Sequence, residues 1–100
     1  MAAPLESTKY FILLALAAEP MHGTAIRRHI VGDTLGYNLR DSTLYSALKS
    51  LLVAGLIEEA LGSDAYRYVY QLSAKGYHAL ETEVRVHRRA VALAEQRLHL

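Results

Sequence analysis

The stretch STLYSALKSLLVAGLI, residues 42–57, decides the fold of this 100-residue chain. Leucines recur in it at helical spacing and mark the buried side of a helix: Leu44, Leu48, Leu51 and Leu52. The opposite face carries short hydroxyls, one tyrosine and one lysine: Ser42, Thr43, Tyr45, Ser46 and Lys49. An ordinary solvated helix favours Glu, Lys and Gln instead. Small hydroxyls allow a close approach to another surface, and Tyr45 and Lys49 can reach phosphate oxygens, so the pattern predicts a DNA recognition helix.

The composition indicates one folded, largely helical domain. Hydrophobic residues make up 52% of the chain, and many of them are alanine and leucine. The net charge is only +1, but between residues 20 and 55 basic side chains outnumber acidic ones, which fits a modest DNA-binding surface. The absence of cysteine excludes disulfides, thiolate-bound zinc and thiol catalysis.

The longest apolar run, residues 10–18, is far shorter than the ~20 residues that a membrane-spanning helix needs. No basic segment precedes this run, so a signal peptide is not expected. We therefore expect a soluble, cytoplasmic protein with no membrane partner.

A first helix is predicted to begin at an N-cap, Ser7 or Thr8, and to run to about Ala18, where Glu19-Pro20 ends it. Its residues 11–16 leave almost no polar face. A helix that is apolar all round must be buried on more than one side. We infer that part of it faces a second subunit.

A second helix is predicted over residues 23–31, with Gly32 at its C-terminal end. After a connecting segment, Asp41 stands where an N-cap acceptor for the recognition helix belongs. Gly55 ends that helix, and Leu56 is placed for the apolar contact that accompanies a glycine terminus.

Two strands follow, over residues 56–61 and 66–72, around the turn Gly62-Ser63-Asp64. Tyr66, Tyr68 and Tyr70 alternate with other residues at the period of a strand, and we interpret them as hairpin packing rather than as a ligand site. Ser73 is predicted to cap a last helix that runs to the end of the chain. The order of elements predicts a mainly α winged helix-turn-helix fold, with a two-stranded β-hairpin as its wing.

The chain resembles the PadR family of bacterial transcriptional regulators, in particular its short-tailed members. The motifs that carry the resemblance lie in family order across roughly residues 8–80: Ile12-Leu13-Leu14-Ala15-Leu16, His22-Gly23-Thr24-Ala25-Ile26, Thr43-Leu44-Tyr45-Ser46-Ala47-Leu48, Gly55-Leu56-Ile57 and Tyr70-Gln71-Leu72-Ser73-Ala74-Lys75-Gly76. Thr24, Ser46 and Ser73 stand where relatives often carry tyrosine, proline and threonine. The resemblance implies a homodimeric repressor.

The expected DNA contacts are the outward face of the recognition helix together with two arginines: Arg40, Ser42, Thr43, Tyr45, Ser46, Lys49 and Arg67. Arg40 lies beside the start of this helix, and Arg67 belongs to the wing. Arg27 and Arg28 are ambiguous, because a phosphate contact and a surface ion pair fit them equally well. The alternative for the helix face is a polar surface with no partner, for Arg40 a surface ion pair, and for Arg67 a solvated side chain.

The last helix carries an apolar seam with alternating steps of three and four, typical of a coiled-coil a/d stripe: Tyr77, Leu80, Val84, His87, Val91, Ala94 and Leu98. We expect the dimer to form through this seam together with Phe11 and Leu14. The alternative is a helix folded back on its own domain. Residues 1–76 then form the DNA-binding part and residues 77–100 the dimerisation helix of one structural unit. The charged residues beside the seam, Glu81, Glu83, Arg85, Arg88 and Arg89, are expected to be solvated.

Motifs of enzymes and metal sites are missing from the sequence: there is no Gly-x-Ser-x-Gly, no glycine-rich phosphate loop and no zinc-binding histidine pattern. We predict no enzyme activity, no cofactor and no metal. The predicted function is that of a DNA-binding repressor that binds a pseudo-palindromic operator and is released by a small-molecule effector. Residues that would line an effector site at the dimer interface are Tyr10, Phe11, His87 and Val91. The alternative is a winged helix that binds only other proteins.

Overall fold

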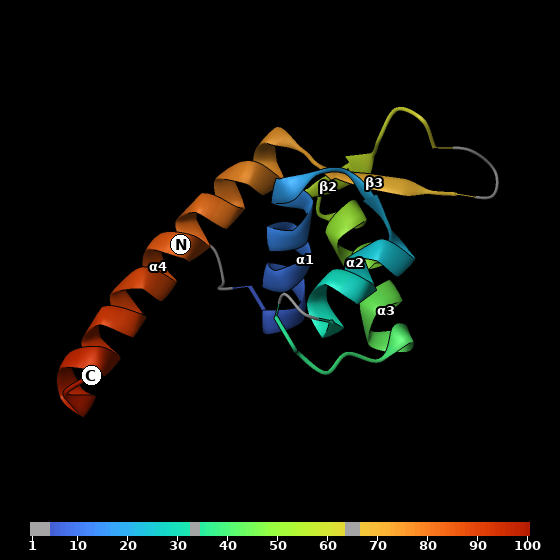
Figure 1. Ribbon diagram of the computed structural model, residues 1–100. Helices are drawn as coiled ribbons and strands as arrows, with labels where there is room; N and C mark the ends of the chain where they lie inside the picture. Colours follow the sequence, from blue (N-terminus) through green and yellow to red (C-terminus); the bar gives the residue numbers. More distant parts are fainter. Residues whose placement is uncertain (1–4, 33–34, 64–66) are drawn as a thin grey trace.

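The computed structural model describes residues 5–32, 35–63 and 67–100, so Asp64 and Tyr66 of the predicted hairpin lie outside the described residues. Within these ranges the elements are α1 (Ser7–Ala18), β1 (Met21–His22), α2 (Gly23–Val31), α3 (Asp41–Val53), β2 (Ile57–Glu59), β3 (Val69–Leu72) and α4 (Ala74–Leu98). Figure 1 shows α1, α2 and α3 packed together, with the hairpin projecting to one side and α4 to the other. This is the mainly helical winged-helix architecture that the sequence predicts.

Helix α1 is the centre of the fold, because α2, α3, α4 and β3 all pack against it. Its buried side chains are Ile12, Leu13, Ala15 and Leu16. Most of its apolar surface is therefore covered within the chain, although Phe11 and Leu14 stay partly exposed. From α3 the core receives Leu44, Leu48 and Leu51, as predicted, whereas Leu52 is only half-buried.

The sheet has one strand more than the sequence predicts. Strand β1 pairs with β3, and β3 with β2, all antiparallel, in the order β1-β3-β2. The two predicted strands are also shorter than expected, because after Glu59 the chain forms a turn instead of continuing as a strand. In that turn Ser63 N–H donates to the carbonyl of Ala60 (3.3 Å), and Gly62 takes a positive φ of 95°. The Ser63 hydroxyl closes the turn by accepting from Val69 N–H (2.8 Å).

The end of α3 follows the prediction for a glycine terminus. Gly55 has φ of 76°, a conformation that favours glycine. Its N–H donates to the carbonyl of Leu52, and Leu56 N–H donates to that of Leu51, both at 3.0 Å. This pair of bonds is the Schellman motif, and it satisfies carbonyls that the helix end leaves free.

Helix α4 begins directly against this end of α3. The Ser73 hydroxyl caps α4 by accepting from Gly76 N–H (3.0 Å), as predicted, and donates to the carbonyl of Gly55 (2.5 Å). Ser73 N–H donates to the carbonyl of Leu56 (3.2 Å), and Lys75 Nζ donates to that of Ala54 (2.9 Å). Gly76 lies so close to the Leu56 carbonyl that a Cβ there would overlap the oxygen. We call these contacts the α3–α4 joint.

The other two predicted N-caps are wrong. The N-cap position is occupied by Glu6 in α1 and by Arg40 in α3, and neither side chain makes a capping hydrogen bond. Asp41, expected to cap α3, is its first helical residue and lies 2.8 Å from Arg27 Nε through Oδ1. The Asp41 side chain therefore pairs with Arg27 of α2 instead of capping the start of α3.

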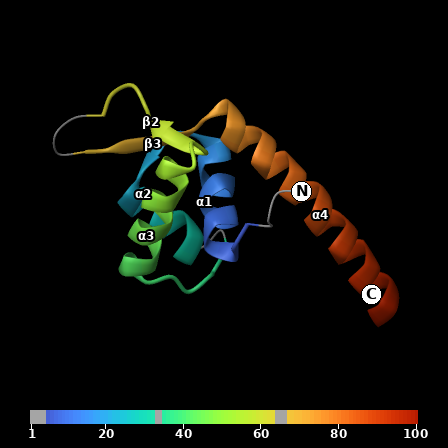
Figure 2. The same cartoon turned by 180° about the vertical axis from the view of Figure 1, so that it is seen from behind.

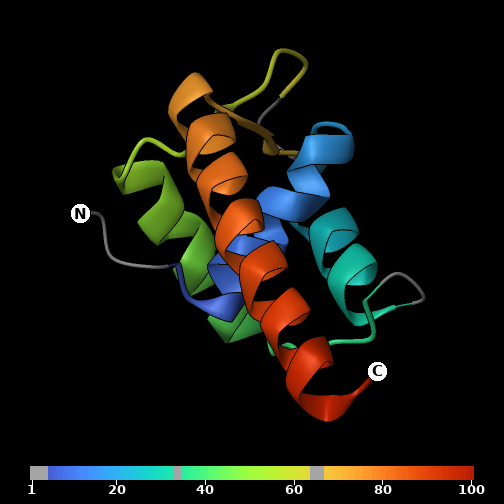
Figure 3. The same ribbon diagram turned by 90° about the vertical axis from the view of Figure 1, so that its left-hand side faces the viewer.

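Helix α4 has two unlike halves. The first half crosses α1 (Figure 3) and buries Gly76, Leu80 and Glu83. From residue 85 onward every residue is exposed, and this half extends away from the body in Figure 1. In the described part of the chain, no helix combines the length and the hydropathy needed to cross a membrane.

Candidate nucleic-acid interface

The outward face of α3 is as polar as the sequence predicts. Ser42, Ser46 and Lys49 follow helical spacing opposite the buried leucines, and all three are exposed. None of them makes a side-chain hydrogen bond or ion pair with any other residue that the structure describes. Val53 continues the same row with 83% of its surface exposed, a residue that the sequence analysis missed. The outward face of α3 thus carries the hydroxyl donors of two serines, the ammonium of Lys49 and, at its C-terminal end, the apolar side chain of Val53.

Tyr45 is placed differently from the other residues of this face. Half of its surface is exposed, but the ring lies against the start of α2. A Cβ at Gly23 would meet Cε1 and Oη of Tyr45 at 3.0 Å, so the glycine makes room for the ring. Tyr45 therefore packs α3 against the start of α2 while half of its surface stays exposed.

A recess of about 360 Å³ joins Tyr45 to the base of the wing. Its lining comes from four elements (β1, α2, α3 and β3) and the segment before β3: His22, Gly23, Thr24, Tyr45, Arg67, Tyr68 and Tyr70. Two predicted DNA contacts, Tyr45 and Arg67, are thus brought together. The sequence analysis missed Thr24, which is exposed at the beginning of α2.

The tyrosines of the wing pack on each other, as expected for Tyr68 and Tyr70, with ring centroids 4.8 Å apart. Burial raises the pKa of the Tyr70 hydroxyl, and the nearby Tyr68 and Tyr45 hydroxyls raise it further. Tyr70 consequently stays neutral and can donate a hydrogen bond throughout the physiological range.

The arginines separate into two kinds. Arg27 Nε lies 2.8 Å from Asp41 Oδ1, but its N–H is not aligned for a hydrogen bond, so the contact is a surface ion pair. Arg40, at the start of α3, and Arg28, on α2, are both exposed. Of the alternatives left open for Arg27, the structure favours the ion pair.

A model of the transcriptional regulator PadR-like family matches residues 12–82, which is more than half of the chain. The chain belongs to the PadR-like family of transcriptional regulators. Membership in a family of regulators also confirms that the chain is not an enzyme.

Solved structures share the fold of this PadR-like chain. A PadR family transcription regulator from hypervirulent Clostridium difficile R20291 has a TM-score of 0.79 and 22% identity, over 93% of this chain and 99% of the other. RosR from H. salinarum gives 0.72 and 24% identity, with 100% of both chains covered. A transcriptional regulator from Clostridium thermocellum has a TM-score of 0.72 and 23% identity, over 88% of this chain and 89% of the other. No curated protein is significantly similar in sequence.

The predicted dimer seam of the PadR-like chain divides at Val84. Leu80 is buried in the core of its own chain, and Val84 is half-buried against that core. Beyond it, Val91 and Leu98 are 55% and 65% exposed. Tyr77, His87 and Ala94 are exposed as well. Leu80 and Val84 therefore pack on their own domain, whereas the other residues of the seam are exposed, with His87 also packing on Tyr10 of α1.

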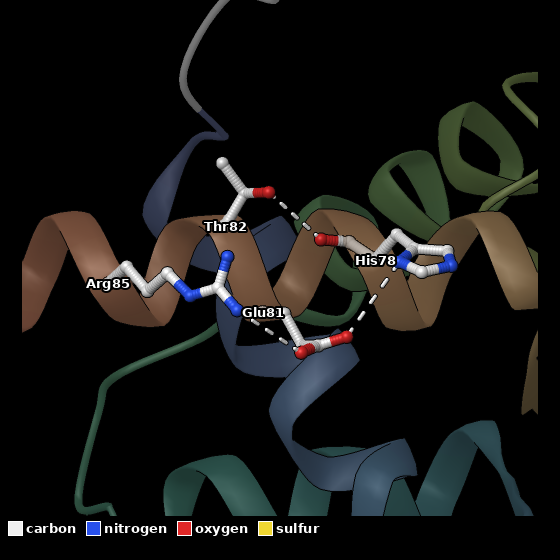
Figure 4. Close-up of polar contacts among 4 residues, drawn as sticks. All are labelled: His78, Glu81, Thr82 and Arg85. Atoms are coloured by element: carbon white, nitrogen blue, oxygen red, sulfur yellow. Dashed lines mark hydrogen bonds and ion pairs between the residues drawn. The ribbon is translucent and has the colours of Figure 1, made fainter.

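Most charges of α4 remain at the surface. Figure 4 shows Glu81 between His78 and Arg85. Its carboxylate lies 3.7 Å from Arg85 Nη2, an ion pair, and 3.7 Å from His78 Nδ1, and the Thr82 hydroxyl donates to the carbonyl of His78 (3.1 Å). These contacts lie within one helix and support it only weakly.

The prediction that Glu83 is solvated is wrong, because only 9% of its surface is exposed. Its Oε1 accepts a hydrogen bond from Leu5 N–H (3.1 Å), and its Oε2 lies 3.7 Å from His87 Nε2. The ring of His87 in turn packs on Tyr10, with centroids 4.4 Å apart. Tyr10 also packs on Phe11, and Phe11 on Tyr37, so three of the four predicted effector residues, Tyr10, Phe11 and His87, lie together. Among the described residues, no group of three His, Asp or Glu side chains is placed to hold a metal ion.

Proposed function

We propose that this PadR-like protein is a homodimeric repressor that places α3 in the major groove of a pseudo-palindromic operator. The observation that carries the proposal is the outward face of α3, whose Ser42, Ser46 and Lys49 are exposed without partners among the described residues. Side-chain donors without partners, on a helix beside a wing, can hydrogen-bond to the base edges and phosphates of DNA. Lys49 and Ser46 are the candidates for base contacts, and Tyr45, Arg40 and Arg67 for the backbone.

The dimer is proposed to form through the second half of α4. Val86, Val91, Leu93 and Leu98 are all large apolar residues that are about half exposed or more. A helix of 25 residues in which every residue from 85 onward is exposed is stabilised when a second copy covers its apolar side chains. Two such chains would present their α3 helices about 34 Å apart, one turn of DNA.

An effector would act by favouring a dimer geometry in which the two α3 helices no longer fit successive major grooves. The partly exposed aromatic group of Tyr10, Phe11 and His87, close to the proposed dimer face, supports this location. Val91 lies one helical turn beyond His87 on α4 and would complete the lining. Relief of repression then follows from binding one geometry better than the other.

Fluorescence anisotropy with DNA from upstream of the protein's own gene, repeated over a salt series, tests the function. We expect affinity to fall steeply with salt, and Lys49→Ala to weaken binding by about 1–3 kcal/mol. Arg89→Ala removes one exposed charge of α4 at a position outside the seam and should leave the curve nearly unchanged. A wild-type protein that does not bind at 50 mM salt would reject DNA binding and favour a protein-binding winged helix.

The dimer needs a separate measurement. Val91→Asp places a charge on the exposed half of α4, where the monomer fold does not depend on the side chain. Light scattering should then report the monomer mass, with an unchanged circular dichroism spectrum. A dimer that survives this substitution would exclude the seam as the interface.

A further inference from the structure

A polar groove of about 470 Å³ separates the start of α1 from α3, on the side of α3 away from the wing. Figure 2 shows the two helices side by side. Seven of the eight residues that line the groove have polar or charged side chains: Glu6, Thr8, Lys9, Ser42, Thr43, Ser46, Ala47 and Ser50. Pockets for small organic ligands are mostly apolar. The lining therefore fits a polar, hydrogen-bonding ligand better than a small apolar effector.

We infer that this groove receives the sugar-phosphate backbone of the operator, with Lys9 as the cation that binds a phosphate. The inference rests on the proposed function, because it assumes that α3 occupies a major groove. Lys9 is half-buried, and its ammonium has no ion pair or hydrogen bond with any residue in the described ranges. Lysine and the hydroxyls of serine and threonine are the usual side-chain donors to phosphate oxygens.

The position of the groove follows from how a helix fits into DNA. The major groove is about 12 Å wide, so an inserted helix has a phosphate strand on each flank. Tyr45 marks the flank of α3 that faces the wing and its recess, where Arg67 lies. Thr43 and Ser50 mark the opposite flank, and they face Lys9 across the polar groove. The two recesses thus lie where the two strands would pass.

The start of α1 is held in place for such a contact. Leu5 packs against the core, and its N–H donates to the buried carboxylate of Glu83 (3.1 Å). The first turn of α1 therefore does not have to become ordered when DNA binds, which lowers the entropic cost of the contact.

Glu6 is the one group of the lining that opposes the inference. Its carboxylate shares the groove with Lys9 and repels a phosphate, yet the two side chains form no ion pair in the described structure. The two charges therefore predict opposite effects on the affinity for DNA. Removing the positive charge must weaken DNA binding, and removing the negative charge must strengthen it.

The experiment compares Lys9→Ala, Lys9→Arg and Glu6→Gln by anisotropy over a salt series, with one operator and one unrelated duplex. Losing one phosphate contact reduces the slope of log affinity against log salt by about 1 per half-site. At 0.1 M salt this corresponds to a loss on the order of 5- to 10-fold per half-site. We expect Lys9→Ala to show this loss on both duplexes, Lys9→Arg to retain binding, and Glu6→Gln to bind more tightly than wild type.

The controls separate this inference from the proposed function. Circular dichroism confirms that each variant is folded, and Arg89→Ala reports the effect of removing a charge outside the proposed DNA and dimer contacts. If Lys49→Ala weakens binding while Lys9→Ala and Glu6→Gln match wild type, the groove is not a phosphate site and α3 remains the DNA contact. If Lys9→Arg loses as much as Lys9→Ala, the charge is not what binds. If the wild type shows no salt-dependent binding, both proposals are wrong.

Discussion

Gly76→Ala is expected to destabilise the protein although it improves the helix propensity of α4. The added methyl overlaps the backbone carbonyl of Leu56, which cannot rotate away as a side chain would. Leu56 is fixed on both sides, because its N–H donates to Leu51 and its carbonyl accepts from Ser73 N–H. Relief of the overlap therefore requires α4 to move off the end of α3.

Overpacking of this kind costs about 1–3 kcal/mol, and loss of the bond between Ser73 and Leu56 costs about 1 kcal/mol. Alanine in place of a helical glycine returns roughly 1 kcal/mol. The free energy of unfolding should therefore fall by about 1–3 kcal/mol, which lowers the Tm of a domain of this size by roughly 5–20 °C.

Thermal melts followed by circular dichroism measure this change, at one fixed protein concentration because dimerisation would shift the Tm. Thr82→Ala is the matched control: it introduces alanine at an exposed site of the same helix and should change stability by less than roughly 0.5 kcal/mol. A Gly76→Ala protein that melts at or above the wild-type Tm would refute the reasoning.

Three further predictions concern the core, the wing and the start of the chain. Leu48→Ala, at a fully buried position of α3, should lower the free energy of unfolding by about 2–5 kcal/mol in urea titrations, and a loss under about 1 kcal/mol would contradict the packing. Burial and two neighbouring tyrosines raise the pKa of Tyr70, so its contribution to stability is complete below about pH 10 and is lost as the pH rises further; Tyr70→Phe should flatten that loss in melts across alkaline pH. Glu83→Ala removes the acceptor of Leu5 N–H, so that amide should exchange with solvent at least several-fold faster, and unchanged exchange would show that the bond is not formed in solution.

Features set by nearby residues could be predicted from the sequence. The leucines of α3, the end of that helix at Gly55 and the cap at Ser73 each depend on a few adjacent positions. The outward face of α3 followed from the same periodicity. The winged helix then followed from the order of these elements.

Features made by distant segments could not be predicted. Strand β1 is two residues long and exists only because β3 lies beside it. Glu83 looked like a solvated charge, since nothing in α4 indicates that Leu5, far away in sequence, covers it. Lys9 was missed for the same reason: its groove is formed with α3, more than thirty residues further along the chain.

The α3–α4 joint has a mechanical consequence. Backbone and side-chain bonds from Ser73 and Lys75, together with the close contact at Gly76, hold the start of α4 directly against the end of α3. Helix α4, with 25 residues, is about 37 Å long and acts as a rigid lever attached to α3. A tilt of only about 5° at one end moves the other by about 3 Å over that length. In the proposed dimer, small changes where the two levers meet are therefore converted directly into a change in the spacing of the two α3 helices.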